Sequence, residues 1–355
     1  SSMQIFCTLF NVAYLDKAIT MYNSLERVSS EFTLYALAMD DRCYEILVDL
    51  NFRNLKPIKL SDFEDDDLLK VKSDRTFGEY CWTCSSSLIS YVLHEYCEPH
   101  CTYIDADIYF FSDPIVLMNE MLHKNASVLI VGHRFNDYNR DLMCRTVGKY
   151  CVQYNTFLND ENGNILLEIW RRQCITHCSC DGDGVYWGDQ KYMDNWTTDY
   201  DFVHETLNVG AGIAPWNISQ YKLRLINDSG CVIVSRNKVD CSTVFYHFEN
   251  INYINDKIVK INVFNTWHID KELVKAFYIP YLTEVYDIKL MLKERYAVNI
   301  LLKKHPGVKC DKRTFVQKII DRLSYLIDKE KQKLYIMSVL PTRLYKKNDV
   351  IIIIG

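Results

Sequence analysis

The chain has 355 residues, of which 48% are hydrophobic and 25% charged, and a formal net charge of −5. At about 100–200 residues per domain, this length predicts one large domain or two modest ones with ample apolar material for a core. The composition excludes a disordered tail, a collagen-like repeat and a small disulfide scaffold, and the weakly acidic charge argues against a general nucleic-acid coat protein.

The first 132 residues alternate between segments with the patterns of strands and of helices. Apolar strands are predicted at 4–10, 32–39, 56–60, 101–104 and 127–132. Helical spacing of apolar residues predicts helices at 16–27, 41–50 and over most of 72–97. This alternation predicts an α/β fold, in which helices cover a parallel sheet and ligands bind at the carboxyl ends of the strands.

The rest of the chain falls into two parts of different composition. Residues 133–250 are rich in Asn, Asp, Gly, Tyr and Trp, which is typical of functional loops on a scaffold. From about residue 270 the sequence is helical and basic. Residues 285–349 hold 16 Lys and Arg against 7 Asp and Glu, a net of +9 that leaves −14 on the remaining residues. The apolar residues 350–355 suggest an edge strand, or a point where a longer protein continues.

The fourteen cysteines are expected to be reduced and mostly buried in a cytoplasmic protein. Ser1 and Ser2 precede Met3 as in the remnant of a cleaved tag, and residues 4–10 lack the basic start of a signal peptide. The sequence has no apolar run of about 18 residues, so no membrane span is expected. The following glycosylation sequons are therefore interpreted as chance matches: Asn125, Asn195, Asn217 and Asn227.

Two cysteine clusters have the spacing of functional sites. Cys81 and Cys84 form a C-x-x-C pair, but they open a long apolar segment, which favours core thiols over a redox motif. A second cluster could hold zinc, although the sequence offers no second Cys/His pair at the usual distance: Cys174, His177, Cys178 and Cys180.

The stretch most informative for function is residues 103–114. An apolar strand ends directly before Asp105 and Asp107, which flank Ala106. Carboxylates in an apolar setting are costly unless they are paired or bound to metal. Asp-x-Asp at a strand end can hold a hard divalent cation with positions open for phosphate oxygens, so it predicts a site for Mn²⁺ or Mg²⁺ and a diphosphate. The alternative is a solvated turn whose aspartates cap the next segment.

Other polar residues fit such a site by chemistry or by position. His247 could add a neutral nitrogen ligand, or could be a satisfied core histidine. Asp189 and Gln190 could hold sugar hydroxyls, with a helix-capping Asp as the alternative. Two basic residues could bind the diphosphate or form a solvated face: Lys72 and Arg75. Four residues near the end of the first strand are positioned to cradle a nucleoside: Thr8, Phe10, Asn11 and Tyr14.

In these motifs the sequence resembles the GT-A glycosyltransferases, particularly the bacterial nucleotide-sugar transferases similar to family 8. The resemblance covers roughly residues 4–250. Its further matches, in chain order, are Tyr154-Asn155-Thr156-Phe157-Leu158, Gly188-Asp189-Gln190 with Met193 and Trp196, a weaker match at 208–217 that could border an acceptor pocket, and Tyr246-His247-Phe248. Family 8 usually has Asn-Ala/Ser-Gly where this chain has Asn155-Thr156-Phe157, a departure that bears on the sugar contacts and so on which sugar is transferred.

The resemblance implies a GT-A domain over residues 3–270, with a nucleotide-binding half at 3–132 and a sugar and acceptor half at 133–270, followed by a basic helical extension at 271–355. It implies a UDP-sugar donor on Mn²⁺ or Mg²⁺, with Asp105, Asp107 and His247 as metal ligands. Asn155, Asp189 and Gln190 would then hold the sugar. It also implies transfer with retention to a saccharide or lipid-linked acceptor, in the synthesis of a cell-surface polysaccharide or lipopolysaccharide.

Other functions use some of the same residue types. An inverting transferase would need a base, with Asp189 or Asp183 as the first candidates. A sugar-phosphate nucleotidyltransferase is disfavoured, because residues 10–14 contain no glycine for a phosphate loop. A glycoside hydrolase would use two carboxylates without metal. A non-catalytic saccharide-binding protein would not need the Asp-x-Asp motif together with a distant histidine.

The basic C-terminal region predicts either a solvated helical face or attachment to the anionic inner surface of a membrane. Its charges alternate with apolar residues. The basic residues are Lys303, Lys304, Lys309, Lys312, Arg313, Lys346 and Lys347, and the apolar ones include Ile319, Ile320, Leu323 and Leu326.

Overall fold

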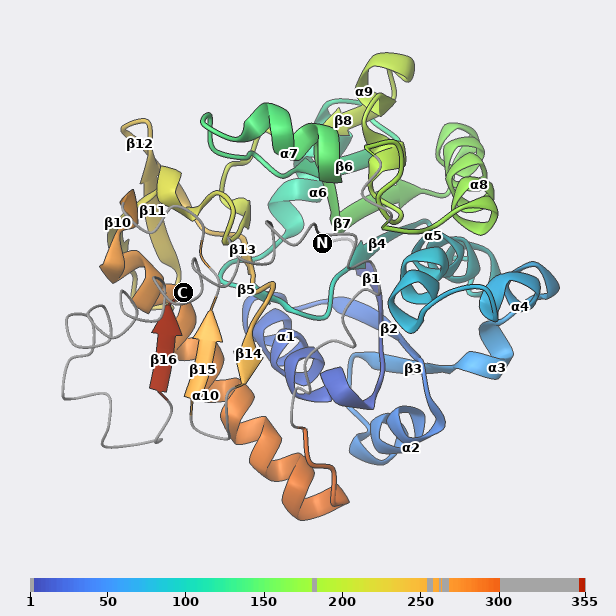
Figure 1. The fold of residues 1–355 in the computed structure, drawn as a ribbon, viewed down its shortest axis with the longest axis horizontal. Coiled ribbons are helices and arrows are strands. Elements are labelled where there is room, and N and C mark those ends of the chain that lie inside the picture. The colour runs from blue at the N-terminus through green and yellow to red at the C-terminus, as the bar shows by residue number, and fades with distance from the viewer. Residues whose placement is uncertain are drawn as a thin grey trace, which may run out of the picture.

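The computed structural model describes residues 3–180, 184–253, 258–261, 263, 268–300 and 351–354 (Figure 1). Its centre is a seven-stranded sheet with the strand order β3-β2-β1-β4-β7-β6-β8. The strands are β1 (Gln4–Phe10), β2 (Phe32–Ala38), β3 (Leu55–Lys59), β4 (His100–Ile104), β6 (Val128–Gly132), β7 (Tyr150–Leu158) and β8 (Val203–Glu205). Neighbouring strands are parallel except for β7, which runs antiparallel to both β4 and β6.

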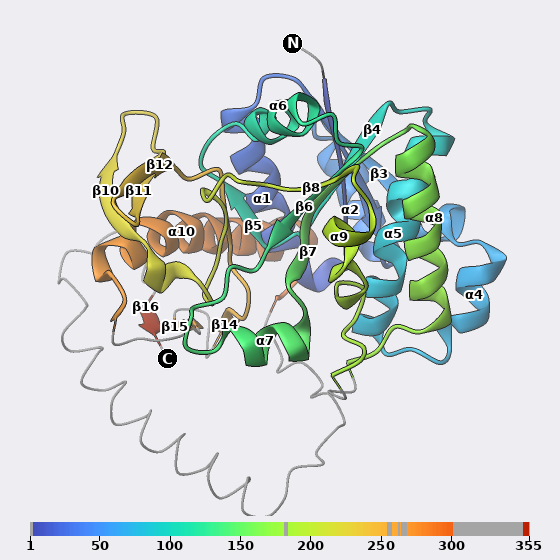
Figure 2. The same cartoon turned by 90° about the horizontal axis from the view of Figure 1, so that it is seen from above.

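Helices cover both faces of this sheet (Figure 2). The helices of the described residues are α1 (Leu15–Val28), α2 (Asp41–Leu50), α3 (Leu60–Phe63), α4 (Asp66–Lys72), α5 (Phe77–Glu95), α6 (Ile115–His123), α7 (Arg140–Val147), α8 (Glu161–Thr176), α9 (Trp196–Asp199) and α10 (Lys271–Tyr296), with short 3₁₀ turns at η1 (Val12–Tyr14), η2 (Lys191–Met193) and η3 (Ile218–Gln220). The apolar sides of α1, α2 and α6 pack on one face, and those of α5 and α8 pack on the other. This arrangement confirms the predicted α/β class with a mixed, mostly parallel sheet.

The long helix predicted over most of 72–97 is confirmed as α5, and only Lys72, at the end of α4, belongs to another helix. The chain leaves α4 at Lys72 and starts α5 at Phe77, because Thr76 and Glu79 form a capping box. The Thr76 hydroxyl accepts a hydrogen bond from the Glu79 N–H at 3.2 Å, and the Glu79 carboxylate accepts one from the Thr76 N–H at 2.9 Å. This reciprocal cap satisfies two backbone donors at the helix start.

Three smaller sheets complete the fold. In the first, β5 (Ile108–Phe110) and β9 (Ala211–Ile213) flank β13 (Phe245–His247), and β13 runs antiparallel to β5. The second joins β10 (Lys222–Ile226), β11 (Val232–Arg236) and β12 (Val239–Ser242). The third joins β14 (Asn252–Tyr253), β15 (Ile258–Ile261) and β16 (Ile351–Ile354). β16 is an edge strand, as predicted for the apolar end of the chain.

The part of the C-terminal region that the structure describes begins with α10. Its N-cap is Asp270, whose carboxylate accepts hydrogen bonds from the N–H groups of Glu272 and Leu273. The apolar side of α10 packs against the core that β11 and β13 share. In the described residues, no helix is long and apolar enough to cross a membrane. The basic residues proposed to face a membrane lie between 303 and 347, outside the described residues.

Candidate functional site

The two aspartates of the Asp-x-Asp motif lie in the turn between β4 and β5. The Asp105 N–H donates to the Gln153 carbonyl of β7 at 3.2 Å, and the Phe248 N–H donates to the Asp107 carbonyl at 2.9 Å. Because β13 pairs with β5, residue His247 stands opposite Ile108, the first residue after the motif. The topology therefore brings the histidine to the carboxyl end of β4, where ligands are expected in an open α/β sheet.

His247 contacts both carboxylates. Its Nε2 lies 2.9 Å from Oδ1 of Asp107 and 3.7 Å from Oδ2 of Asp105. The histidine is buried, and a donor set of two carboxylates and one imidazole suits Mn²⁺ well and Mg²⁺ acceptably. The residues present therefore fit a divalent cation at this position.

Cys151 of β7 is a further donor that the sequence analysis did not select. Its Sγ, a carboxylate oxygen of Asp105 and a ring nitrogen of His247 all lie within 4.8 Å of one another. Cys151 is buried among Phe135, Ala214 and Trp216, so the thiol faces the cluster from an apolar side. Burial raises the pKa of this thiol to about 12, so it is protonated at neutral pH without a cation.

The electrostatics of the cluster separate the roles of the two aspartates. Burial raises the pKa of Asp105 well above its ordinary value, and the nearby Asp107 and Asp189 add to the rise. Burial also acts to raise the pKa of Asp107, but His247 outweighs it and holds that pKa below its ordinary value. Burial lowers the pKa of His247, and Asp107 reverses this and raises it well above the usual range. Asp107 and His247 thus form an ion pair, and a cation would compete with the protons held here.

Gln153 fixes the orientation of the histidine ring. Its Oε1 lies 2.9 Å from His247 Nδ1, so an Nδ1–H can donate to it. Nε2, which faces the carboxylates, is then the nitrogen available to a metal. The approach of β7 to β9 depends on Gly212, because a Cβ there would lie 2.8 Å from Gln153 Nε2. Gly212 has φ +77°, a conformation that side chains disfavour.

Asp189 is buried close to the cluster. The Ser85 hydroxyl donates to its Oδ2 at 2.6 Å, and Trp170 Nε1–H donates to its backbone carbonyl at 2.8 Å. Burial raises the pKa of Asp189 to about 7, and Ser85 opposes the rise. The charge of Asp189 in turn raises the pKa of Asp105. A carboxyl with this pKa can donate or accept a proton near neutral pH.

Asn155 and Gln190 differ in how available their amides are. Asn155 is 0% exposed on β7, opposite Tyr103, and neither amide atom has a hydrogen-bond partner among the described residues. A buried amide without partners is costly, and a ligand would satisfy it. The Gln190 amide instead donates to the Val147 carbonyl at 2.7 Å, at the end of α7. In this conformation the Gln190 side chain binds the C-terminal end of α7.

Two of the residues predicted to cradle a nucleoside have polar groups available at the end of β1, Thr8 within the strand and Asn11 directly after it. The Thr8 hydroxyl and the Asn11 Oδ1 are buried and have no hydrogen-bond partner in the described part of the chain. Burial raises the pKa of Tyr14, and Asp107, Asp16 and Asp105 add to the rise, so its phenol is within electrostatic reach of the cluster.

Four other predicted binding residues are engaged elsewhere. The side chains of Phe10 and Ala106 pack in the apolar core, which leaves their backbones for a ligand. Lys72 forms an ion pair with Glu64 at 2.7 Å, and Arg75 donates to the Cys174 carbonyl at 2.8 Å, at the end of α8. Both basic residues thus have partners within the protein.

Lys17 and Glu249 are charged residues at the cluster that the sequence analysis missed. Lys17 is 3% exposed, and its Nζ lies 4.7 Å from the centre of the Tyr14 ring. Burial raises the pKa of Asp107, whereas His247 lowers it. Lys17 lowers it further. Burial raises the pKa of Glu249, with His247 opposing and Asp107 adding to the rise. Both charges therefore act on Asp107.

The loop at 208–217, which the resemblance suggested could border an acceptor pocket, lies beside the cluster. Its Trp216 ring lies edge-on to His247 at 5.4 Å. Trp216 Nε1–H and the Asn217 amide both donate to the His133 carbonyl at 2.9 Å, which holds the loop against β6. The loop thus forms one wall beside the histidine.

The cysteine clusters show no converging ligand set. In α5, burial raises the pKa values of both Cys81 and Cys84, which favours protonated core thiols. Of the described His, Cys, Asp and Glu side chains, those found to converge as metal ligands are Asp105, Cys151 and His247, and the cluster at 174–180 is not among them.

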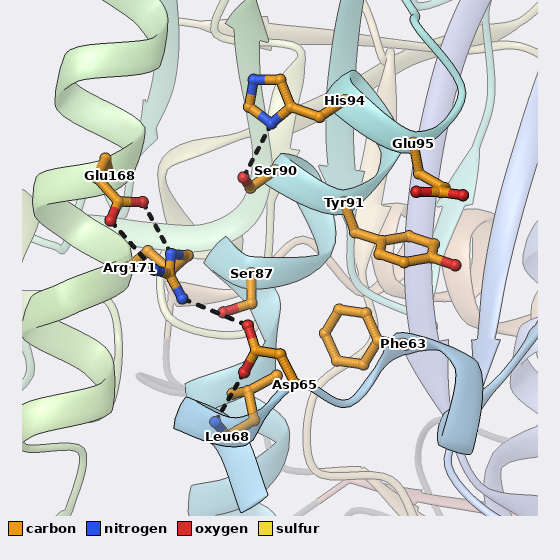
Figure 3. Close-up of a pocket in the computed structure, with 10 residues that line it drawn as sticks. All are labelled: Phe63, Asp65, Leu68, Ser87, Ser90, Tyr91, His94, Glu95, Glu168 and Arg171. Carbon is orange, nitrogen blue, oxygen red and sulfur yellow. Dashed lines mark hydrogen bonds and ion pairs between the residues drawn. The ribbon is translucent and has the colours of Figure 1, made fainter.

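A separate pocket lies between α4, α5 and α8 (Figure 3). Arg171 crosses it, with Nε 2.8 Å from Glu168 and Nη1 3.8 Å from Asp65. Its apolar wall includes Phe63 and Tyr91, whose rings meet edge to face at 5.5 Å. None of the predicted site residues lines this pocket. Its ion pairs join Arg171 of α8 to Asp65 at the start of α4 and to Glu168 of α8.

No protein-family model matches the chain. Two relatives are known from Bacillus subtilis (strain 168), both described as uncharacterized. YfnD is 29% identical over 281 residues, which cover 78% of this chain and 87% of the relative. YfnF is 27% identical over 285 residues, which cover 77% of this chain and 89% of the relative. These similarities extend over most of both chains.

Solved structures that the chain matches include three glycosyltransferases. Mouse xyloside xylosyltransferase 1 in its apo form is 14% identical, with 60% of this chain and 88% of that chain covered and a TM-score of 0.42. The galactosyltransferase LgtC, in complex with donor and acceptor sugar analogues, is 14% identical, with coverages of 70% and 87% and a TM-score of 0.44. The apo form of GlyE from Streptococcus pneumoniae TIGR4 is 12% identical, with coverages of 59% and 47% and a TM-score of 0.38.

Proposed function

We propose that the protein is a metal-dependent glycosyltransferase of the GT-A type, similar to family 8. It would move a hexose-type sugar from a UDP-sugar to a saccharide or lipid-linked acceptor in the synthesis of a cell-surface polysaccharide or lipopolysaccharide. The observation that carries the proposal is the convergence of the half-buried Asp105 and Asp107 on the buried His247 at the carboxyl end of β4.

The residues at the cluster divide into those that bind the cation and those that bind the diphosphate. Asp105, Asp107 and His247 would hold Mn²⁺ or Mg²⁺, which supplies positive charge to stabilise the departing UDP. Gln153 keeps the Nε2 of the histidine directed at this position. Lys17 is buried beside Tyr14 and adds a fixed positive charge on the same side. Phosphate oxygens would find charge-assisted donors there without the reorganisation that water requires.

The sugar would lie between the cluster and β7. Asn155 has both amide atoms available and Asp189 lies close to Asp105, so hydroxyl groups of a sugar would satisfy groups that are otherwise costly to bury. Asp189 with a pKa of about 7 accepts a hydrogen bond from Ser85 and can also exchange a proton with a ligand. Gln190 would join this set only after leaving the Val147 carbonyl.

The stereochemical outcome depends on the role of Asp189. We favour retention, in which the acceptor hydroxyl attacks the face that the UDP leaves and no enzyme base is obligatory. The raised pKa of Asp189 supports a second candidate, an inverting transferase with Asp189 as the general base. Asp183, the other candidate base, lies outside the described residues. The anomeric configuration of the product, measured by NMR, decides between the two: a β product from an α-linked donor would exclude retention.

The proposal is tested by screening nucleotide sugars for thermal stabilisation and hydrolysis, with Mn²⁺ and with chelator. UDP-sugars are expected to stabilise the protein only when metal is present. Asp105→Ala and Asp107→Ala should remove that stabilisation, whereas Asp201→Ala, an exposed position, should retain it. Hydrolysis or transfer that is unaffected by chelator would contradict the proposal and favour a metal-free glycoside hydrolase.

We also propose that the basic residues of the C-terminal region hold the enzyme at an anionic membrane surface, where a lipid-linked acceptor would be available. The support for this is the net charge of +9 over residues 285–349. Flotation with liposomes of anionic lipid tests it. Binding at low salt that falls as salt rises is expected, and no binding at low salt would exclude it.

A further inference from the structure

Cys151 gives the candidate metal site a sulfur donor. It lies on β7 two residues before Gln153, so both side chains point to the same face of the strand, and both approach His247. The Cys151 Sγ, an Asp105 oxygen and a His247 nitrogen lie within 4.8 Å of one another. A buried cysteine in a core normally meets only apolar groups, whereas this one meets a carboxylate and an imidazole.

We propose that Cys151 is a ligand for thiophilic divalent cations, so that Zn²⁺ or Co²⁺ binds through Asp105, Cys151 and His247. The proposed function uses a second, overlapping set for Mn²⁺ or Mg²⁺, in which Asp107 takes the place of Cys151. The inference rests on the proposed function only in placing a cation at the same cluster. When the cation binds, the Cys151 thiol and the Nε2–H of His247 each release a proton to solvent, and the sulfur and the nitrogen form bonds to the metal.

The geometry is close to that of a three-ligand zinc site. Zinc binds nitrogen and oxygen at about 2.0–2.2 Å and sulfur at about 2.3 Å, which sets tetrahedral ligands roughly 3.3–3.8 Å apart. The observed limit of 4.8 Å for the three donors requires a shift of about 1 Å, within the range of side-chain rotation. Three protein ligands leave a fourth position for water or a phosphate oxygen.

The surroundings of the thiol favour a soft metal. Phe135, Ala214 and Trp216 form the apolar cluster that contains Cys151, and they limit the access of water to it. Thiolate ligands select Zn²⁺ over Mg²⁺ and Mn²⁺, which prefer oxygen. Both ligand sets need Asp105 and His247, so Zn²⁺ displaces Mn²⁺ from the site instead of adding to it. The cysteine thereby makes the enzyme sensitive to zinc.

Cobalt substitution tests the ligand directly. The metal-free protein is titrated with Co²⁺, and near-ultraviolet absorption reports a cobalt–sulfur bond without reference to activity. The wild type is expected to show sulfur-to-cobalt charge transfer at one Co²⁺ per chain. Cys151→Ser should lose this band. Cys231→Ser is the matched control, because Cys231 is equally buried but its Sγ contacts backbone carbonyls and serine side chains, and this variant should keep the band.

A second measurement separates the inference from the proposed function. Mn²⁺ bound to the protein is followed by electron paramagnetic resonance while Zn²⁺ is added. In the wild type, Zn²⁺ is expected to displace Mn²⁺. In Cys151→Ser, the affinity for Zn²⁺ should fall about tenfold or more, while the affinity for Mn²⁺ should be nearly unchanged. The magnitude is set by comparison with outer-shell partners, whose loss costs about 10–100-fold in metal affinity. Bound Co²⁺ without a sulfur band overturns the inference and leaves the proposed function standing. Failure of both Mn²⁺ and Co²⁺ to bind overturns both.

Discussion

The His247 ring is held by Gln153, whose Oε1 lies 2.9 Å from Nδ1. The two residues come from different sheets, since Gln153 lies on β7 of the central sheet and His247 on β13. Gln153 is 0% exposed, so the bond is shielded from water. A hydrogen bond at Nδ1 fixes which nitrogen faces Asp105 and Asp107, and this makes Gln153 a positioning residue for the candidate metal ligand.

Substitution of this amide should weaken metal binding. In Gln153→Leu, Nδ1 loses its acceptor and the histidine can turn away from the carboxylates, so the affinity for Mn²⁺ is expected to fall about 10–100-fold. Calorimetric titration of the metal-free protein with Mn²⁺ measures the change. Gln173→Leu, on α8, is the control and should bind like the wild type. Unchanged affinity in Gln153→Leu would remove the assigned role of the amide.

Gly212 offers a second test of the position of Gln153, because it lies against the amide of that residue. In Gly212→Ala the new Cβ would lie 2.8 Å from Gln153 Nε2 and 2.9 Å from Val131 Cγ1, at φ +77°. We expect lower stability, lower Mn²⁺ affinity and a readjusted Gln153. Gly230→Ala is a matched control, because Gly230 has φ +85° and a Cβ there meets nothing within 4 Å.

The two variants separate backbone strain from the clash. Strain in the left-handed region costs on the order of 1 kcal/mol and should appear in both. The additional loss in Gly212→Ala, measured as the difference between the two unfolding free energies, then reports the clashes with Gln153 and Val131 together. If only stability falls and Mn²⁺ affinity stays the same in Gly212→Ala, then Gln153 does not transmit the change to His247.

The ion pair at the cluster predicts a change in the titration of His247. In the metal-free protein burial lowers the pKa of His247, and Asp107 more than reverses this. In Asp107→Asn the partner charge is lost and burial remains, so the pKa of His247 should fall below that of the wild type. NMR of the ring in the presence of chelator follows this titration. The same fall in Asp201→Asn, an exposed position, would show that the effect is not local.

Lys17 is expected to support binding of the diphosphate without supporting the metal. Lys17→Met keeps most of the side-chain volume and removes the charge that lies 4.7 Å from the Tyr14 ring. A charge-assisted hydrogen bond contributes about 1.5–3 kcal/mol, so UDP affinity in the presence of Mn²⁺ should fall about tenfold or more. Lys59→Met, at an exposed position of β3, is the control. Calorimetric titration with UDP in the presence of Mn²⁺, and with Mn²⁺ alone, measures the two affinities separately, and only the affinity for UDP should fall.

Local sequence patterns predicted the scaffold well. The strand at 4–10 and the helix at 41–50 have the predicted bounds, because their apolar spacing is regular and Asp40 caps the helix by accepting from the Cys43 N–H. The long helix predicted over most of 72–97 is confirmed, but the sequence analysis did not place its start at Phe77, because the capping box at Thr76 was not recognised. A cap overrides apolar periodicity at a helix start, and it has a sequence signature of its own.

The site could be predicted only in part. The Asp-x-Asp motif stands out locally, whereas His247 was chosen through the resemblance, because only the pairing of β13 with β5 brings it to the motif. Cys151 and Gln153 carry no local signal in the sequence. Lys17 has the sequence context of an ordinary helix surface residue, and only the packing of its helix buries it next to the cluster.

The raised pKa of Asp189 gives a stability test with a defined sign. Burial sets this pKa to about 7 in the folded protein, against about 3.9 in an unfolded chain. The folded state therefore binds more protons between these values, and stability is lost as the pH rises from about 4 to about 7. The difference of about three units corresponds to at most about 4 kcal/mol.

Asp189→Asn removes the ionisable group and keeps an oxygen that can accept from the Ser85 hydroxyl. Relative to the wild type, this variant should therefore gain stability as the pH rises from 4 to 8, with the gain complete above about pH 7. Urea unfolding of the metal-free protein across this range measures it, with Asp201→Asn at an exposed position as the control. If the free energies of unfolding of Asp189→Asn and the wild type change in parallel with pH, then ionisation of Asp189 does not destabilise the folded protein. That result would remove the support for Asp189 as a base.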